Sequence, residues 1–222
     1  MSEDNKEYMV DAVNFDSHPL IKYRKPFGVM PDHVIEDYCK HANMIVPFVN
    51  KKTNTCDLYP GAKVPSYGLS SCGYDIRLAP HWKKYKKMPF GQCIDVLSLD
   101  KTLDEQLEKH VEGFSRNSIV LEPGELVLSH TIETFNMPSD VFATCIGKST
   151  WARLGVHVLV TPLEPGWSGQ LVVEITNTSS VPIKVYAGVG IAQLVFTKIP
   201  PPTTPYGEGK YQNQTGTTNA KL

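Results

Sequence analysis

From residue 117 onward the chain is a series of short apolar runs separated by turn residues, and this pattern constrains the fold most. The runs are rich in Val, Ile, Leu and Thr, and PG, MPSD, EPGWSG and AGVG separate them. Such turn signals at short spacing are typical of consecutive strands. No helical pattern intervenes, so the sequence predicts an all-β barrel or sandwich with minor helices. The expected strands are 125–130, 141–146, 156–161, 170–176, 182–186 and 190–196.

Two segments have helical patterns. In 31–43, Pro31 suits a first helical turn, acidic residues lie near the positive end of the helix dipole, and apolar residues share one face. A weaker helical pattern covers 101–111.

Composition divides the chain into three parts. Residues 1–29 are polar without a clear period, and we expect an N-terminal extension there. Residues 30–199 are expected to form the single folded domain. Residues 200–222 contain many Pro, Gly, Thr and Gln residues, so this tail should be mobile unless something orders it.

The charge balance and the cysteines exclude several functions. Twenty-two Lys and Arg residues against 23 Asp and Glu residues leave a net charge of -1, which predicts no general attraction to nucleic acid or to an anionic membrane. There is no apolar run of membrane-spanning length and no signal peptide, so we expect a cytoplasmic protein. Five cysteines without a C-x-x-C pair favour neither a disulfide framework nor a zinc site.

Three short motifs have ordinary interpretations. His110-Val111-Glu112 matches half of a zinc deaminase signature, but the required downstream C-x-x-C is absent, and we expect a solvated helix end. Gly188-Val189-Gly190 lies between expected strands and predicts a turn, not a dinucleotide site. The basic run KKYKKM (83–88) predicts a solvated loop.

Two segments carry candidate chemistry. In 147–153, a glycine, two hydroxyls and two cations are typical of a phosphate cradle, although a polar connection between strands is the alternative. In the expected strand 170–176, alternation places Glu174 on the face opposite Val173 and Ile175. Burying a carboxylate among apolar residues costs free energy unless the carboxylate is paired with another group or takes part in function. The alternative is that Glu174 lies on a side of the strand that faces solvent.

Three ordered blocks resemble the dCTP deaminase branch of the dUTPase-like superfamily. They are YGLSSCGYDIRL (67–78), the long block GKSTWARLGVHVLVTPLEPGWSGQLVVEITNTSSVPIKVYAGVGIAQLVF (147–196) and KYQNQTGTT (210–218). The resemblance implies a distorted jelly-roll β-barrel that assembles as a homotrimer, with active sites between subunits and a tail that closes over the nucleotide. It also implies deamination of a cytosine nucleotide without zinc.

The resemblance assigns roles by position. Glu174 is the general base and acid, Ser149 helps to hold the attacking water, and Arg153 supports that arrangement. The remaining substrate contacts that it implies are Lys148, Thr150, Thr161, Pro162, Leu163, Glu164, Trp167, Val172, Gln193, Tyr206, Lys210 and Gln214. We expect burial to raise the pKa of Glu174 and the nearby Arg153 to oppose that rise.

The activity expected is hydrolysis of dCTP to dUTP and ammonia, and several alternatives stay open. The same fold suits dCMP as substrate, a dUTPase, or a bifunctional enzyme that converts dCTP through to dUMP. Glu174 favours deamination over a dUTPase, which places an apolar residue there. A nucleotide sensor without activity would not need Glu174. Mg²⁺ is expected only through the nucleotide phosphates, dTTP is a candidate feedback inhibitor, and trimers pairing into hexamers stay open.

Overall fold

The computed structural model describes residues 27–86, 90–91, 93–94 and 111–221. The strands are β1 (Gly28–Val29), β2 (Ile45–Val46), β3 (Gly68–Ser70), β4 (Gly73–Arg77), β5 (His81–Tyr85), β6 (Val111–Ser115), β7 (Ser118–Leu121), β8 (Leu126–Asn136), β9 (Val141–Gly147), β10 (Val156–Leu159), β11 (Ser168–Asn177), β12 (Ile183–Tyr186) and β13 (Gly190–Lys198). The helices within these residues are α1 (Asp32–Ala42) and α3 (Ser149–Ala152). None of the described helices is long and apolar enough to cross a bilayer.

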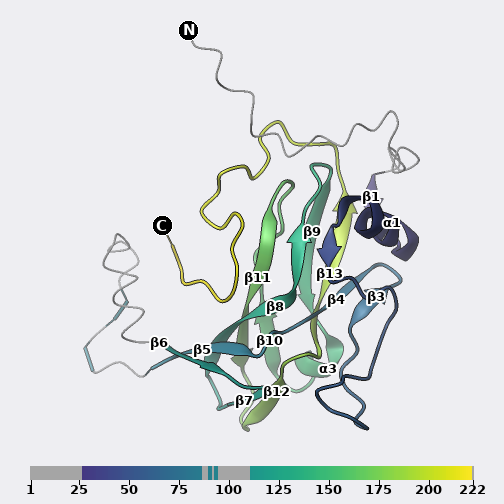
Figure 1. Cartoon of the computed structure of the whole chain (residues 1–222). Helices are drawn as coiled ribbons and strands as arrows, with labels where there is room; N and C mark the ends of the chain where they lie inside the picture. The colour runs from purple at the N-terminus through teal and green to yellow at the C-terminus, as the bar shows by residue number, and fades with distance from the viewer. Residues whose placement is uncertain (1–26, 87–89, 92, 95–110, 222) are drawn as a thin grey trace.

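Antiparallel sheets build the molecule (Figure 1). The larger sheet has the order β10-β11-β8-β5-β6, with β2 also paired to β8. The second sheet has the order β1-β13-β4-β3, with β9 also paired to β13, and β12 pairs with β7. The all-β prediction with minor helices is confirmed, and the pairing of strands distant in sequence gives the crossed connections of a jelly roll.

One apolar core lies behind the larger sheet. Val173 and Ile175 of β11 and Leu194 and Phe196 of β13 are fully buried in the same cluster. The alternation predicted for 170–176 is confirmed, because the odd-numbered residues are buried and the even-numbered residues are half-buried. The inner face of β11 therefore belongs to the core, and its outer face, which bears Glu174, is available for a site.

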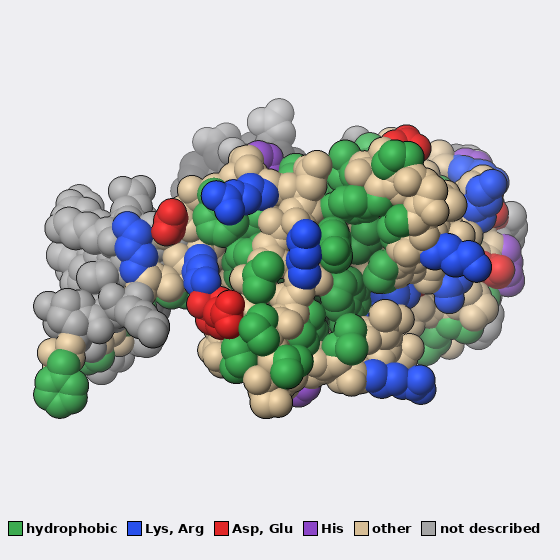
Figure 2. All heavy atoms as spheres, turned by 90° about the horizontal axis from the view of Figure 1, so that it is seen from below, with side chains coloured by type: hydrophobic (Ala, Val, Ile, Leu, Met, Phe, Trp, Pro, Cys, Tyr) green, Lys and Arg blue, Asp and Glu red, His purple; other side chains and the backbone are tan. Residues whose placement is uncertain are grey.

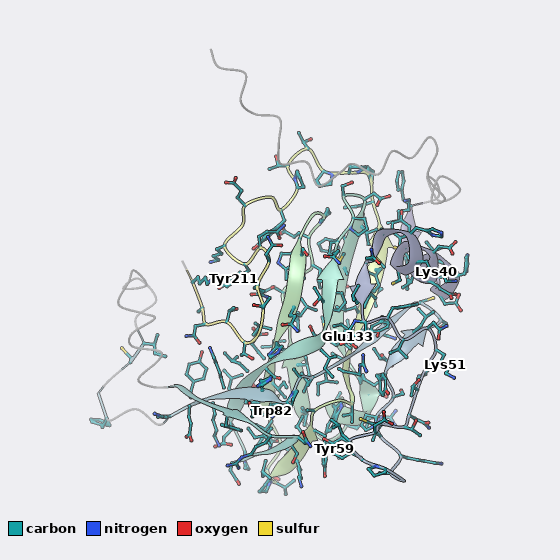
Figure 3. All side chains as sticks on the ribbon, viewed as in Figure 1. Lys40, Lys51, Tyr59, Trp82, Glu133 and Tyr211 are labelled. Carbon is teal, nitrogen blue, oxygen red and sulfur yellow. The ribbon has the colours of Figure 1, made fainter. Side chains whose placement is uncertain are left out.

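A buried ion pair links the two sheets. Glu133 of β8 is fully buried, and its Oε1 accepts a hydrogen bond from Arg77 Nε of β4 at 2.7 Å. The backbone N–H of Arg77 donates to Glu133 Oε2, and Tyr74 O–H donates to Oε1. Figure 3 shows Glu133 between the strands. These contacts satisfy a carboxylate whose burial would otherwise be very costly.

Each of the six predicted strands is present, with ends that shift by a few residues. The predicted helix at 31–43 is also present as α1, which ends at Asn43 in the left-handed conformation with a φ of 49°. The predicted turn at Gly188 is confirmed, with a φ of 75°. Gly28 and Val29, from the expected extension, pair with β13 as β1.

Three local expectations need correction. Lys83, Lys84 and Tyr85 are not loop residues but belong to β5, where pairing with β6 and β8 outweighs their high polarity. The helical pattern of 101–111 falls mostly outside the described residues, but Val111 begins a strand, so Glu112 does not end a helix. The segment 147–153 contains the single-turn α3, which is too short to show apolar periodicity in the sequence.

Candidate active site

A cavity of about 290 Å³ lies on the outer face of the larger sheet, between β11 and the C-terminal tail. Figure 1 shows the tail, in yellow, on the same side of the molecule as β11. Its walls come from β5, β8, β11, the segment after β10 and the tail. The lining residues are Tyr85, Leu126, Leu128, Val160, Thr161, Pro162, Glu164, Trp167, Leu171, Val172, Glu174, Tyr206, Tyr211, Gln214, Thr218, Asn219 and Ala220.

Glu174 is the half-buried acid in the middle of the β11 wall. It pairs across the sheet with Leu128 of β8 on one side and with Leu159 of β10 on the other. Burial among these apolar neighbours raises the pKa of its carboxyl above the ordinary value. Among the described residues no Lys, Arg or His forms an ion pair with Glu174. A carboxyl with a raised pKa holds its proton at higher pH than a free carboxyl does, which suits a general base and acid.

Tyr85 of β5 lines the same cavity. Burial first, and the charge of Glu174 second, raise the pKa of the Tyr85 hydroxyl above its ordinary value. The phenol therefore stays protonated next to the carboxylate and is available as a hydrogen-bond donor.

The tail is held against the sheet by backbone pairing. The N–H of Gln170 donates to Gln214 O at 2.9 Å, and the N–H of Asn213 donates to Ser168 O at 2.8 Å. The indole N–H of Trp167 donates to Tyr211 O at 3.0 Å. Figure 3 shows Tyr211 on this tail, on the side of the molecule where β11 lies. From the sequence we expect the tail to be mobile unless something orders it. In the structure the tail is ordered, because β11 supplies hydrogen-bond partners for its backbone.

Gly169 makes this close approach feasible. Its φ is 146°, and a Cβ atom at this position would lie 2.8 Å from Gln214 O and 3.0 Å from Gln214 N. A side chain would therefore collide with the backbone of the tail. Docking of the tail thus requires glycine at position 169, the last residue of the Trp-Ser-Gly sequence.

The cavity brings together many of the predicted site residues. These are Thr161, Pro162, Glu164, Trp167, Val172, Glu174, Tyr206 and Gln214. They lie far apart in the sequence, from the loop after β10 to the tail, and the fold places them around one space. Glu164 and Glu174 are the acidic members of the described lining, which contains no Lys, Arg or His.

The predicted phosphate cradle lies outside that lining. Ser149, Thr150 and Arg153 are exposed at α3, immediately before β10. Lys148 is engaged within the chain, because its Nζ donates to Asp75 Oδ2 at 2.6 Å and contacts Ser66 Oγ at 3.4 Å. Within one copy, then, Arg153 does not contribute to the pKa of Glu174, and the opposing effect expected from it is absent.

A second, more open hollow adjoins α3. Thr150 lines it together with Lys52, Asn54, Lys63 and Ser66. Of the predicted cradle residues, Thr150 lines this hollow, and its cations come from Lys52 and Lys63 and not from Lys148 or Arg153.

Three further predicted contacts also lie away from the cavity. Leu163 is buried and pairs with Ala143 through a β-bridge. Gln193 Nε2 donates to Ser70 Oγ at 2.8 Å. Lys210 is exposed, and its Nζ donates to Lys221 O at 2.7 Å. In one copy of the chain these side chains have structural partners.

The sequence pattern does not point to several of the lining residues. Tyr85 falls in a run whose polarity predicts a loop, so its strand position is hidden. Tyr211, Thr218 and Asn219 belong to the tail, and their position at the cavity follows from the docking of Gln214 on β11.

Metal-binding side chains are not clustered. Among the described residues, no group of three or more His, Cys, Asp or Glu side chains is placed to hold a metal ion. The five cysteines are unpaired thiols. Two carboxylates in the cavity, Glu164 and Glu174, do not by themselves form a complete ligand set for a divalent cation.

The family model and the curated relatives that match this chain share one description. The sequence model of the dCTP deaminase-like family matches residues 41–199. The dCTP deaminases of Campylobacter fetus and Campylobacter concisus are each 40% identical over 198 residues, which is 88% of this chain and 98% of the relative.

A crystal structure of 2′-deoxycytidine 5′-triphosphate deaminase from Agrobacterium tumefaciens has a TM-score of 0.54 at 19% identity. The likeness covers 78% of this chain and 49% of that one, so this chain spans about half the length of that structure. It shows a shared fold, and the β-barrel expected from the resemblance is confirmed. With the family model and the curated relatives together, the chain belongs to the dCTP deaminase-like family.

Proposed function

We propose that the protein hydrolyses dCTP to dUTP and ammonia, with Glu174 as the general base and acid. The observation that carries the proposal is the Glu174 carboxyl, half-buried with a raised pKa in a cavity that the tail closes. Membership of the dCTP deaminase-like family supports the choice of a deoxycytidine nucleotide.

The chemistry requires water to attack C4 of the cytosine ring. Glu174 takes one proton from the water as its oxygen bonds to C4, and passes that proton to ring N3. The remaining hydroxyl proton then moves to the amino group, the C4–N bond breaks, and ammonia leaves as C4=O forms. A cavity that excludes bulk water strengthens each of these electrostatic interactions.

The proposal places the base beside β11 and the sugar beside Glu164. Val172 lies on the Glu174 face of β11, and Trp167 forms another part of the wall. Exposed backbone near Thr161 and Pro162 is placed to meet the polar edge of the base. Tyr206 and Gln214 close the site from the tail.

A second copy of the chain completes the site in this proposal. The described lining contains carboxylates but no cation, whereas a triphosphate requires cations. Ser149 and Arg153 are exposed at α3, next to the edge strand β10. In a homotrimer, α3 of a neighbouring copy supplies Ser149 to the water, and Arg153, which follows α3, brings a cation to the site.

Apolar exposure near this edge supports assembly. Leu159 of β10 is 66% exposed, and Leu154 and Ile146 are about half exposed. Figure 2 shows hydrophobic side chains gathered across the middle of the face seen from below. Such a patch at a sheet edge is typical of a surface that another chain covers.

Mg²⁺ enters this proposal as part of the substrate. Without a clustered ligand set among the described side chains, the phosphates themselves hold the ion. The metal neutralises phosphate charge and thereby assists binding, and the deamination step is performed by Glu174 and water. We place the reaction in the cytoplasm, where five unpaired thiols are kept reduced.

The test is to incubate the protein separately with dCTP, dCMP and dUTP, with and without a chelator, and to measure ammonia and pyrophosphate. We expect ammonia from dCTP, less from dCMP, and a chelator effect confined to dCTP. Release of pyrophosphate from dUTP would indicate a bifunctional enzyme, and dCMP turnover above that of dCTP would contradict the triphosphate assignment. Adding dTTP to the dCTP reaction tests it as a competing ligand.

A further inference from the structure

The outer face of the larger sheet carries a row of side chains that extends from Glu174 away from β10. Leu128 of β8 pairs with Glu174 on one side and with Lys83 of β5 on the other. Directly paired residues point to the same face, so Lys83 lies on the same row as Glu174, about 10 Å away at two strand spacings.

The tail crosses this face and contacts it through two side-chain pairs. Lys83 Nζ donates to Asn219 Oδ1 at 2.9 Å. His130 Nδ1 lies 2.8 Å from Thr217 Oγ1. These two pairs, Lys83–Asn219 and His130–Thr217, are called the tail latch below. They reach the sheet at β5 and β8, whereas the backbone pairing of the tail is with β11.

Neighbouring side chains hold His130 in place. His130 is buried, and its ring stacks on that of His81 with centroids 5.5 Å apart and planes at 9°. His81 Nδ1 in turn lies 2.7 Å from Ser115 Oγ of β6. Burial, and then the neighbouring His81, lower the pKa of His130 to about 4, so the ring is neutral at pH 7.

Thr218 lies between the two latch contacts and faces the cavity. Its Oγ1 donates to Gln214 Oε1 at 2.9 Å, and both residues line the cavity with Glu174. Anchoring the tail on both sides of Thr218 therefore fixes the side chains that form this part of the cavity wall.

We propose that Lys83 and His130 are positioning residues, which anchor tail residues 217–219 and so determine how firmly the tail closes over the bound nucleotide. Neither residue needs to touch the substrate in this role. The effect on turnover rests on the proposed deamination, whereas the anchoring itself is a property of the protein without nucleotide.

The first arm of the test measures the tail without nucleotide. Hydrogen exchange of residues 211–221 is compared between the wild type and Lys83→Met, Thr217→Val and Asn219→Ala. Lys84→Met is the control, because Lys84 lies on the same strand and pairs with Glu125, away from the tail. We expect exchange about 3- to 10-fold faster in the three latch variants, as for the loss of one hydrogen bond, and wild-type exchange in the control.

The second arm measures steady-state deamination of dCTP. In Lys83→Met and Thr217→Val we expect KM to rise about 3- to 10-fold while kcat falls less, because closure and not the proton transfer is affected. Lys83→Met combined with Asn219→Ala should cost less than the sum of the two single changes, since both remove the contact between Lys83 and Asn219. Lys83→Arg, which keeps a cationic donor for Asn219, should retain a KM near that of the wild type.

Unchanged exchange in the latch variants would overturn the anchoring, and so would additive effects in the double variant. Faster exchange with an unchanged KM would overturn the role in closure. If the wild type released no ammonia from dCTP, the proposed function would fail, while the exchange arm would still decide whether the latch exists.

Discussion

The Glu174 carboxyl is desolvated by apolar neighbours but opens onto a cavity, and its described surroundings provide no cation. Replacing it with Gln keeps the size of the side chain and removes its ability to carry a proton. We expect Glu174→Gln to lower kcat for dCTP by about 10²- to 10⁴-fold or more while nucleotide binding is kept. Single-turnover ammonia release and equilibrium binding measure the two separately. Glu122→Gln, at an exposed turn, is the control, and near-normal turnover in Glu174→Gln contradicts the assignment.

The raised pKa of Glu174 also has a consequence for stability. A carboxyl with a higher pKa in the folded than in the unfolded state destabilises the fold when ionised. This penalty is absent below the unfolded pKa, grows as pH rises towards the folded pKa, and is constant above it. Glu174→Gln should therefore melt at a higher temperature than the wild type at pH 8 and at the same temperature at pH 4. Thermal unfolding across this range checks the sign, and a Glu174→Gln variant less stable at pH 8 contradicts it.

For single residues, the sequence predicts which face of a strand a side chain lies on, because side chains alternate along a strand. Strand alternation by itself predicts that Glu174 lies on the face away from the core, and the fold confirms it. Alternation says nothing about side chains that meet across the fold. The pairing of Lys148 with Asp75 joins positions 73 residues apart and withdraws from the solvent a cation expected to be available for phosphate.

At the scale of elements, the contact between β11 and the tail depends on Gly169. Ala at this position would be strained at a φ of 146° and would collide with the tail backbone. We expect Gly169→Ala to raise KM for dCTP about tenfold or more and to make the tail sensitive to protease. Limited trypsin digestion and steady-state kinetics measure the two effects. Gly113→Ala is the control, because its nearest neighbour would be Trp82 O at 4.0 Å, and a tail that stays protected in Gly169→Ala contradicts the role.

Some helices, strands and ordered segments can be recognised from the sequence, and others cannot. Six of the seven strands after residue 117 are recognisable because their aliphatic runs are bounded by Gly and Pro turns, and β7 is the one that is not predicted. β5 has the sequence HWKKY and is not recognisable in this way, since long lysine stems lie along a sheet while their ammonium groups reach solvent or partners. The tail has few aliphatic residues, yet backbone hydrogen bonds with Ser168 and Gln170 order it, and composition does not reveal such bonds.

For the whole molecule, the separation of Glu174 from Ser149 predicts complementation between subunits. Glu174→Gln and Ser149→Ala should each be inactive alone. In trimers assembled from equal amounts of both, about a quarter of the sites should combine Glu174 of one copy with Ser149 of the next. Deamination by the mixture should therefore recover to about a quarter of the wild-type rate. No recovery, with mixed trimers demonstrated by mass, contradicts a shared site.

The ion pair between the two sheets predicts where stability is concentrated. Arg77→Met leaves Glu133 buried without its charged partner and should lower the free energy of unfolding by about 3 kcal/mol or more. The exposed pair Lys40–Glu36 on α1, at 2.8 Å, is the comparison (Figure 3), and Lys40→Met should cost about 0.5 kcal/mol or less. Urea unfolding measures both, and equal losses for the two variants contradict the distinction.

The placement of Trp167 has a practical consequence. Its indole is 5% exposed, lines the cavity and is bonded to the tail through Tyr211 O. The other two tryptophans, Trp82 and Trp151, are buried and lie outside the cavity lining. Release of the tail admits water to the Trp167 ring, so the red shift and quenching of intrinsic fluorescence follow opening and closing in real time, without any attached dye.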